Sequence, residues 1–169
     1  MSASGRVARI NCSAGGVPKL PVAQAQVTAQ GLVGDQQKNL KYHGGPDRAL
    51  CLWSLEIIQT LQAEGHPIAP GSAGENLTLA GLDWASLVPG RQLHLGPQLQ
   101  IEITDYAAPC RKNMRWFSDR RFSRISQRHY PGSSRLYARV LQGGLVTTGD
   151  RVQAVSWADG PDATGAPGL

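Results

Sequence analysis

The residues with the clearest potential chemistry are a cysteine and two cations in the stretch Pro109-Cys110-Arg111-Lys112. Neighbouring positive charges favour the thiolate over the thiol, so we expect a depressed pKa for Cys110; the thiolate is the form that attacks electrophiles and binds metals. Pro109 lacks an N–H and fixes its own φ, so it should end a preceding strand. Two interpretations stay open: a nucleophilic or metal-binding thiolate at the mouth of a β-structure, or a capped strand end whose cations face water.

A second cluster, residues 38–48 (KNLKYHGGPDR), combines cations with consecutive glycines. Glycine lets the backbone turn sharply and approach a ligand closely. Lys38, Lys41, His43 and Arg48 could donate hydrogen bonds to an anion. The same sequence is also ordinary turn chemistry, with Asp47 stabilising the turn and the cations exposed.

The third cluster is residues 70–77 (PGSAGENL), a small-residue loop that leads into a strand. Asn76 could orient a ligand through a hydrogen bond, and Glu75 could act as a base or pair with an arginine. Alternatively, both side chains satisfy backbone groups of the loop. The other two cysteines, Cys12 and Cys51, lie in apolar runs and are interpreted as buried small hydrophobes. Three widely spaced cysteines without a C-x-x-C pair argue against a disulfide framework or a structural zinc site.

The charge of the chain is positive and unevenly distributed. The formal net charge is +5 over 169 residues. Seven cations crowd one region: Arg111, Lys112, Arg115, Arg120, Arg121, Arg124 and Arg128. This region could contact a phosphate backbone, or it could be the solvated face of a helix. The aromatic residues near it do not alternate with the cations, as a stacking platform for single-stranded nucleic acid would require.

No stretch approaches the ~20 apolar residues of a membrane helix. Residues 1–5 lack the apolar core of a signal peptide, so a cytoplasmic protein without a membrane partner is expected.

Short elements separated by glycine and proline must position these clusters. Apolar runs and alternation predict strands over residues 7–12, 22–29, 49–53, 76–80, 91–95, 98–104, 136–141 and 151–157. Residues 54–64 predict a helix with Ser54 as N-cap, 83–88 a single helical turn, and 116–129 a basic helix. Many short strands with few helices predict a mostly β fold, a β-barrel with helical insertions, with a β-sandwich as the alternative. We expect one domain over residues 1–157 and a disordered tail over residues 158–169.

Taken in order, these clusters resemble the MOSC domain, named for the C-terminal domain of molybdenum-cofactor sulfurases, in its short stand-alone bacterial form. The resemblance spans roughly residues 5–155. The matching segments are Gly34-Asp35, residues 43–49, residues 70–78, residues 109–112, residues 137–140, Gly144 and Gly149-Asp150.

The resemblance implies a β-barrel of the pyruvate-kinase-barrel-like type, and binding of the molybdenum cofactor, molybdopterin. It implies that Cys110 ligates molybdenum or carries sulfur, and that Lys38, His43, Arg48 and Lys112 hold the anionic cofactor. Glu75 and Asn76 would line the site. Related proteins reduce N-hydroxylated compounds, so the implied activity is a molybdenum-cofactor-dependent reductase or a sulfur carrier. A separate electron-donor protein would then be required.

Two segments depart from the family pattern. Ala73 stands where a larger residue is expected, and residues 132–136 are less glycine-rich than usual. Both differences bear on the shape of the substrate pocket. Two rival functions remain: a non-catalytic basic β-barrel that binds nucleic acid or another anionic ligand, and a thiol enzyme without a metal.

Overall fold

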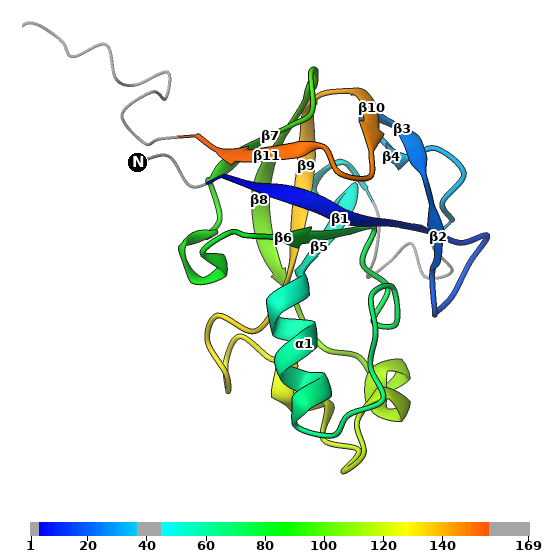
Figure 1. Ribbon diagram of the computed structural model, residues 1–169, viewed down its shortest axis with the longest axis vertical. Helices are drawn as coiled ribbons and strands as arrows, with labels where there is room; N and C mark the ends of the chain where they lie inside the picture. The colour runs from blue at the N-terminus through cyan, green and yellow to red at the C-terminus, as the bar shows by residue number, and fades with distance from the viewer. Residues whose placement is uncertain (1–3, 37–44, 156–169) are drawn as a thin grey trace, which may run out of the picture.

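The computed structural model describes residues 4–36 and 45–155 (Figure 1). Seven strands close into a barrel in the order β11-β7-β8-β9-β5-β6-β1, with β11 pairing back onto β1. Their bounds are β1 Ser4–Cys12, β5 Leu50–Ser54, β6 Leu77–Ala80, β7 Gln92–Leu95, β8 Leu99–Ala107, β9 Arg135–Gln142 and β11 Arg151–Ala154. The predicted barrel is therefore confirmed, and closure removes the exposed edges that an open sheet would present.

Shorter elements surround the barrel. β2 (Leu20–Val22) pairs with the end of β1, and a three-stranded sheet has the order β10-β3-β4. The bounds of its strands are β3 Gln24–Thr28, β4 Gly31–Leu32 and β10 Gly144–Thr147. Four 3₁₀ turns complete the described elements: η1 Pro46–Arg48, η2 Trp84–Ser86, η3 Arg111–Trp116 and η4 Phe122–Ile125.

The core of the barrel follows the strand alternation that the sequence predicts. In β8, Leu99, Ile101 and Ile103 are fully buried, whereas the residues between them are half-buried. β7 pairs antiparallel to β8 and places Leu93 opposite Ile101, so the two strands bury the same face. A one-residue slip would turn this apolar set outward, which fixes the register.

The α-helix α1 (Leu55–Ala63) connects the parallel strands β5 and β6, as a crossover connection must. The Ser54 hydroxyl accepts the N–H of Ile57 at 3.2 Å, and Ile58 and Leu61 are buried. The predicted helix and its cap are confirmed. In Figure 1, α1 lies below the barrel together with the segment between β8 and β9.

The basic helix predicted over residues 116–129 is wrong. The segment forms η3, η4 and irregular turns instead. Arg120 adopts a left-handed φ of 62°, and the Asp119 carboxylate accepts the N–H of Arg121 at 2.9 Å, a local bond that competes with helix. Phe117 and Ile125 are nevertheless buried. The core therefore holds this segment through two apolar anchors, without a regular helical face.

Two strand predictions also need correction. The single strand predicted over residues 22–29 is divided between β2 and β3. The sequence did not predict β10, because Gly143 and Gly144 looked like a turn.

The tail predicted over residues 158–169 lies outside the described residues. Within the described ranges, no helix has the length and apolar character needed to cross a membrane.

Candidate functional site

Three of the sequence clusters meet at one end of the barrel. The register of β8 and β9 places Ala107 opposite Arg135, and that of β5 and β9 places Cys51 opposite Tyr137. The N–H of Asn76 donates to the carbonyl of Cys51 at 2.7 Å. The loop before β6, the start of β5 and the chain leaving β8 therefore surround the same end of the barrel.

Cys110 stands where the chain leaves this end and enters η3. Cys110 is half-buried, and Asn113 holds its backbone. The Cys110 N–H donates to Asn113 Oδ1 at 3.1 Å, and the Asn113 N–H donates to the Cys110 carbonyl at 2.9 Å. Asn113 itself is only 1% exposed. Cys110 is thus a half-buried cysteine whose backbone is fixed by hydrogen bonds to Asn113.

Arg135 is the residue that the sequence analysis missed. Its side chain is buried, and its guanidinium donates to the Ala73 carbonyl at 2.6 Å and the Ala108 carbonyl at 3.0 Å. It also lies 3.5 Å from Asn113 Oδ1. Arg135 therefore ties the 70–77 loop to the segment that carries Cys110. The one signal in the sequence was an arginine at the start of an apolar strand.

Glu75 is fully buried beneath this segment. Burial raises the pKa of its carboxyl to about 7, because desolvation penalises the charged form. The backbone N–H groups of Gly71 and Glu75, the Thr78 hydroxyl and the charge of Arg135 lower the pKa and so partly oppose this rise. Glu75 is therefore positioned to change charge near neutral pH.

Asn76 is bonded within the protein framework through both ends of its amide. Its Oδ1 accepts the N–H of Cys51 at 2.9 Å, and its Nδ2 donates to Asp35 Oδ2 at 2.9 Å. Asp35 forms a buried ion pair with Lys19 at 2.5 Å. Asn76 thus supports the wall of the site, and its predicted role as a ligand-lining residue stays a prediction.

The wall also contains a second thiol and a phenol. Burial raises the pKa of Cys51 to about 11 and that of Tyr137 to about 12. Arg48 lies over the Tyr137 ring at 4.9 Å and forms an ion pair with Asp105 at 3.7 Å. Cys51 is a buried, neutral thiol, as the sequence predicted. Cys12 is half-buried, and burial raises its pKa as well.

An open pocket of about 470 Å³ is lined in part by the residues that follow Cys110 in the chain. Its lining residues are Gly16, Val17, Arg111, Lys112, Met114, Arg115 and Arg120. All four cations are exposed. Arg115 donates to the Val17 carbonyl at 2.6 Å, which joins the 13–18 loop to η3. The pocket offers concentrated positive charge to an anionic ligand.

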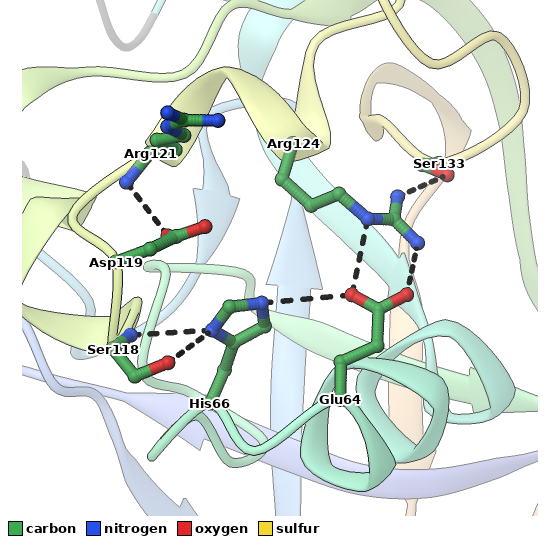
Figure 2. Close-up of polar contacts among 7 residues, drawn as sticks. All are labelled: Glu64, His66, Ser118, Asp119, Arg121, Arg124 and Ser133. Carbon is green, nitrogen blue, oxygen red and sulfur yellow. Dashed lines mark hydrogen bonds and ion pairs between the residues drawn. The ribbon is translucent and has the colours of Figure 1, made fainter.

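The far end of the cationic segment is fixed to α1 by a cluster of polar contacts (Figure 2). Arg124 donates to both oxygens of the Glu64 carboxylate, at 2.7 and 3.1 Å. The hydrogen bond from Arg124 is the main cause that lowers the pKa of Glu64. The Ser118 N–H donates to His66 Nδ1 at 3.2 Å, and His66 Nε2 lies 3.5 Å from Glu64. These contacts hold η3 and η4 against the end of the helix.

The structure therefore brings Arg48, Glu75, Asn76 and Cys110 to the same end of the barrel. Arg48 contacts Tyr137, and Asn76 contacts Cys51. Arg135 binds the backbone two residues before Cys110. Lys112 lines the adjacent pocket. Lys38 and His43, the other two predicted cofactor-binding residues, lie outside the described residues.

The side chains at this end of the barrel limit the kind of metal site that can form there. Within residues 4–36 and 45–155, no group of three or more His, Cys, Asp or Glu side chains could enclose a metal ion. Cys110 can offer one soft sulfur ligand. A metal bound here would have to bring most of its own ligands, and the neighbouring cations fit an anionic carrier such as a phosphorylated pterin.

Comparison with known proteins matches residues 39–153 to the MOSC domain. "Uncharacterized protein YflK" of Bacillus subtilis (strain 168) is 29% identical over 144 residues, which cover 83% of this chain and 63% of YflK. "Protein YiiM" of Escherichia coli (strain K12) is 37% identical over 97 residues, covering 53% of this chain and 41% of YiiM. The chain thus spans less than two thirds of the length of either relative.

Solved structures share the fold. The YuaD protein of Bacillus subtilis superposes with a TM-score of 0.75 at 16% identity, covering 93% of this chain and 98% of that one. YiiM of Escherichia coli superposes with a TM-score of 0.66 at 25% identity, covering 89% and 70%.

Proposed function

This chain belongs to the MOSC domain family, and from that premise we propose that it binds the molybdenum cofactor with Cys110 as the thiolate ligand. The observation that carries the proposal is the half-buried Cys110 at the end of the barrel, next to an open pocket lined by four cations. A soft thiolate suits a molybdenum centre that is otherwise bound by sulfur.

The cations of the pocket would hold the phosphate of the pterin. Arg111, Lys112, Arg115 and Arg120 line the pocket. Guanidinium groups bind phosphate through paired, charge-assisted hydrogen bonds, whereas Lys112 would act as a point charge. Arg48, which lies over the Tyr137 ring, would contribute further positive charge.

The activity that we propose is the reduction of an N-hydroxylated compound. The bound cofactor would supply two-electron redox chemistry. The substrate R–NHOH takes up two electrons and two protons, its N–O bond breaks, and R–NH₂ and water are released. The electrons would come from a separate electron-donor protein. In the sulfur-carrier alternative, the same Cys110 thiol would carry sulfur as a persulfide.

Metal analysis of two cysteine variants tests the proposal. Protein expressed in a cofactor-competent host should contain about one molybdenum per chain, as a single thiolate site implies. Cys110→Ser should lose the metal. Cys12→Ser, in which the replaced thiol is also half-buried, is the matched control and should keep it. Full retention in Cys110→Ser would exclude Cys110 as the ligand.

The nucleic-acid rival makes a different prediction. If the cationic segment bound nucleic acid, the metal-free protein would bind a single-stranded oligonucleotide with an affinity that falls steeply with salt. Absence of molybdenum together with such binding would favour the rival.

A further inference from the structure

Arg135 is a buried cation that forms no ion pair with a carboxylate within the described residues, 4–36 and 45–155. Only 4% of its surface is exposed. Its Nε is buried and has no hydrogen-bond partner within the same ranges. Burying an arginine in this way is expensive, and an apolar side chain could fill similar volume at lower cost. We therefore expect Arg135 to have a role that depends on its charge and its planar shape.

The contacts of Arg135 converge on the backbone that carries Cys110. One terminal nitrogen, Nη1, donates to the Ala73 carbonyl in the 70–77 loop, and the other, Nη2, donates to the Ala108 carbonyl, two residues before the cysteine. Nη2 also lies 3.5 Å from Asn113 Oδ1. The planar guanidinium can span these acceptors together, which a lysine ammonium cannot reproduce.

Asn113 links the Arg135 guanidinium to the backbone of Cys110. Its Oδ1 is the acceptor for the Cys110 N–H, so the same oxygen lies between the guanidinium and the cysteine backbone. The Asn113 side chain is buried. Because an amide oxygen has two lone pairs, it can serve both donors at once. Arg135 fixes the direction of this oxygen, and the oxygen fixes Cys110.

We propose that Arg135 and Asn113 are positioning residues that hold the Cys110 thiol in the orientation its ligand requires. The inference rests on the proposed role of Cys110, and it adds two residues that do not touch the cofactor in that proposal. Glu75 and the Lys19–Asp35 ion pair are other buried charged groups of this barrel end.

Amide hydrogen exchange at Cys110 in the cofactor-free chain is the first test. Asn113→Ala removes the acceptor, so the Cys110 amide should exchange about 10-fold faster, the amount expected for one lost hydrogen bond. Arg135→Lys should accelerate the same amide. Asn113→Asp keeps an acceptor oxygen and should restore the slow rate. The amide of Ile101 in β8 reports global opening, so only acceleration at Cys110 that exceeds any change at Ile101 counts as local release of the cysteine.

Arg9→Lys is the matched control for Arg135→Lys. Arg9 donates to the Pro70 carbonyl at 2.9 Å, and its Nε also lacks a partner in the described part of the chain. The Arg9→Lys chain should show wild-type exchange at Cys110. Unchanged exchange at Cys110 in both Asn113→Ala and Arg135→Lys would overturn the proposal.

Molybdenum content supplies the second readout. Asn113→Ala and Arg135→Lys should retain several-fold less metal than Arg9→Lys, and Asn113→Asp should recover it. Wild-type metal content in folded Asn113→Ala would overturn the positioning role, even if exchange at Cys110 is faster. If Cys110→Ser also keeps its metal, the proposed function fails, whereas the exchange result still decides how Cys110 is held.

Discussion

The inner wall and the outer rim of the barrel end are built from opposite kinds of contact. The inner wall consists of Cys51, Glu75, Asn76, Arg135 and Tyr137, which are all buried. The outer rim consists of Cys110, Arg111, Lys112, Arg115 and Arg120. Its cations are exposed, and Cys110 is half-buried. In the wall, most polar atoms bond to other protein groups, as burial requires, and Arg135 Nε and Glu75 Oε1 are the exceptions in the described part of the chain. In the rim, charge faces an open pocket.

This difference separates the residues that shape the site from those that can meet a ligand. Cys51 and Cys110 illustrate it, since both thiols lie at the same barrel end. Burial raises the pKa of Cys51 to about 11, which keeps it a neutral thiol near pH 7. Cys110 lies at the boundary between wall and rim, where Asn113 holds its backbone and its thiol remains partly accessible. Variants of the wall should therefore affect folding, and variants of the rim should affect binding.

Asn76→Ala should have the largest effect on the free energy of unfolding. The substitution leaves the Cys51 N–H without its acceptor and removes a donor from Asp35, which lies in a buried ion pair. Unsatisfied buried polar groups of this kind should cost about 4 kcal/mol in total. Urea denaturation measures the loss. A loss below about 0.5 kcal/mol, the range expected for an exposed site, would contradict the distinction between wall and rim.

Glu75→Gln should change how stability depends on pH. The pKa of Glu75 is about 7 in the folded protein and 4.5 as a free group, so between these values the folded state binds more protons. The carboxyl therefore lowers wild-type stability as pH rises from about 4.5 to 7. The stability of Glu75→Gln relative to wild type should rise by roughly 3 kcal/mol over that window.

Denaturation of both chains at pH 4.5, 6 and 8 measures this difference. Glu102→Gln, which replaces a half-buried carboxylate on β8 that is ion-paired with Arg139, is the control for loss of a carboxylate outside the wall. A relative stability of Glu75→Gln that stays constant or falls between pH 4.5 and 8 would contradict the assignment of Glu75 to the desolvated wall.

The sequence predicted local features of the fold better than the contacts between segments that are distant in the chain. The alternation in β8 and the cap at Ser54 are properties of neighbouring residues, and both are confirmed. Arg135 was missed because its acceptors at Ala73 and Ala108 lie 62 and 27 residues away in the chain. Only the closed barrel brings them within hydrogen-bond distance. The place of Arg135 at the start of an apolar strand was the one local signal, and that signal did not identify its acceptors.

The sequence predicted the positive charge of the rim but not its secondary structure. The cations at residues 111–128 suggested a helix with a solvated face, yet the segment forms two 3₁₀ turns fixed by Phe117 and Ile125 in the core. Contacts of Ser118 and Arg124 with the end of α1 complete the anchoring (Figure 2). Because the contacts of Ser118 and Arg124 are long-range, the periodicity of the segment carried no information about them.

Rim variants should have the smallest effect on stability. Lys112 and Arg120 are exposed and line the pocket, so the double variant Lys112→Ala/Arg120→Ala should change the free energy of unfolding by less than about 0.5 kcal/mol. Its affinity for an anion should nevertheless fall about 10-fold, because two of the four cations around the ligand are lost. Calorimetric titration of the metal-free chain with pyrophosphate at low salt measures this affinity.

Arg121→Ala/Arg128→Ala is the charge-matched control for that experiment. Both arginines are exposed and belong to the same segment, but neither lines the pocket. If the pocket binds the anion through direct contacts, this control should keep most of the wild-type affinity. Equal losses in the two double variants would mean that the net charge of the segment attracts the anion at long range, an effect that salt screens over a Debye length of ~10 Å at 0.1 M. The rim would then steer anions toward the barrel end without forming a binding site, and the phosphate contacts proposed for Lys112 and Arg120 would be wrong.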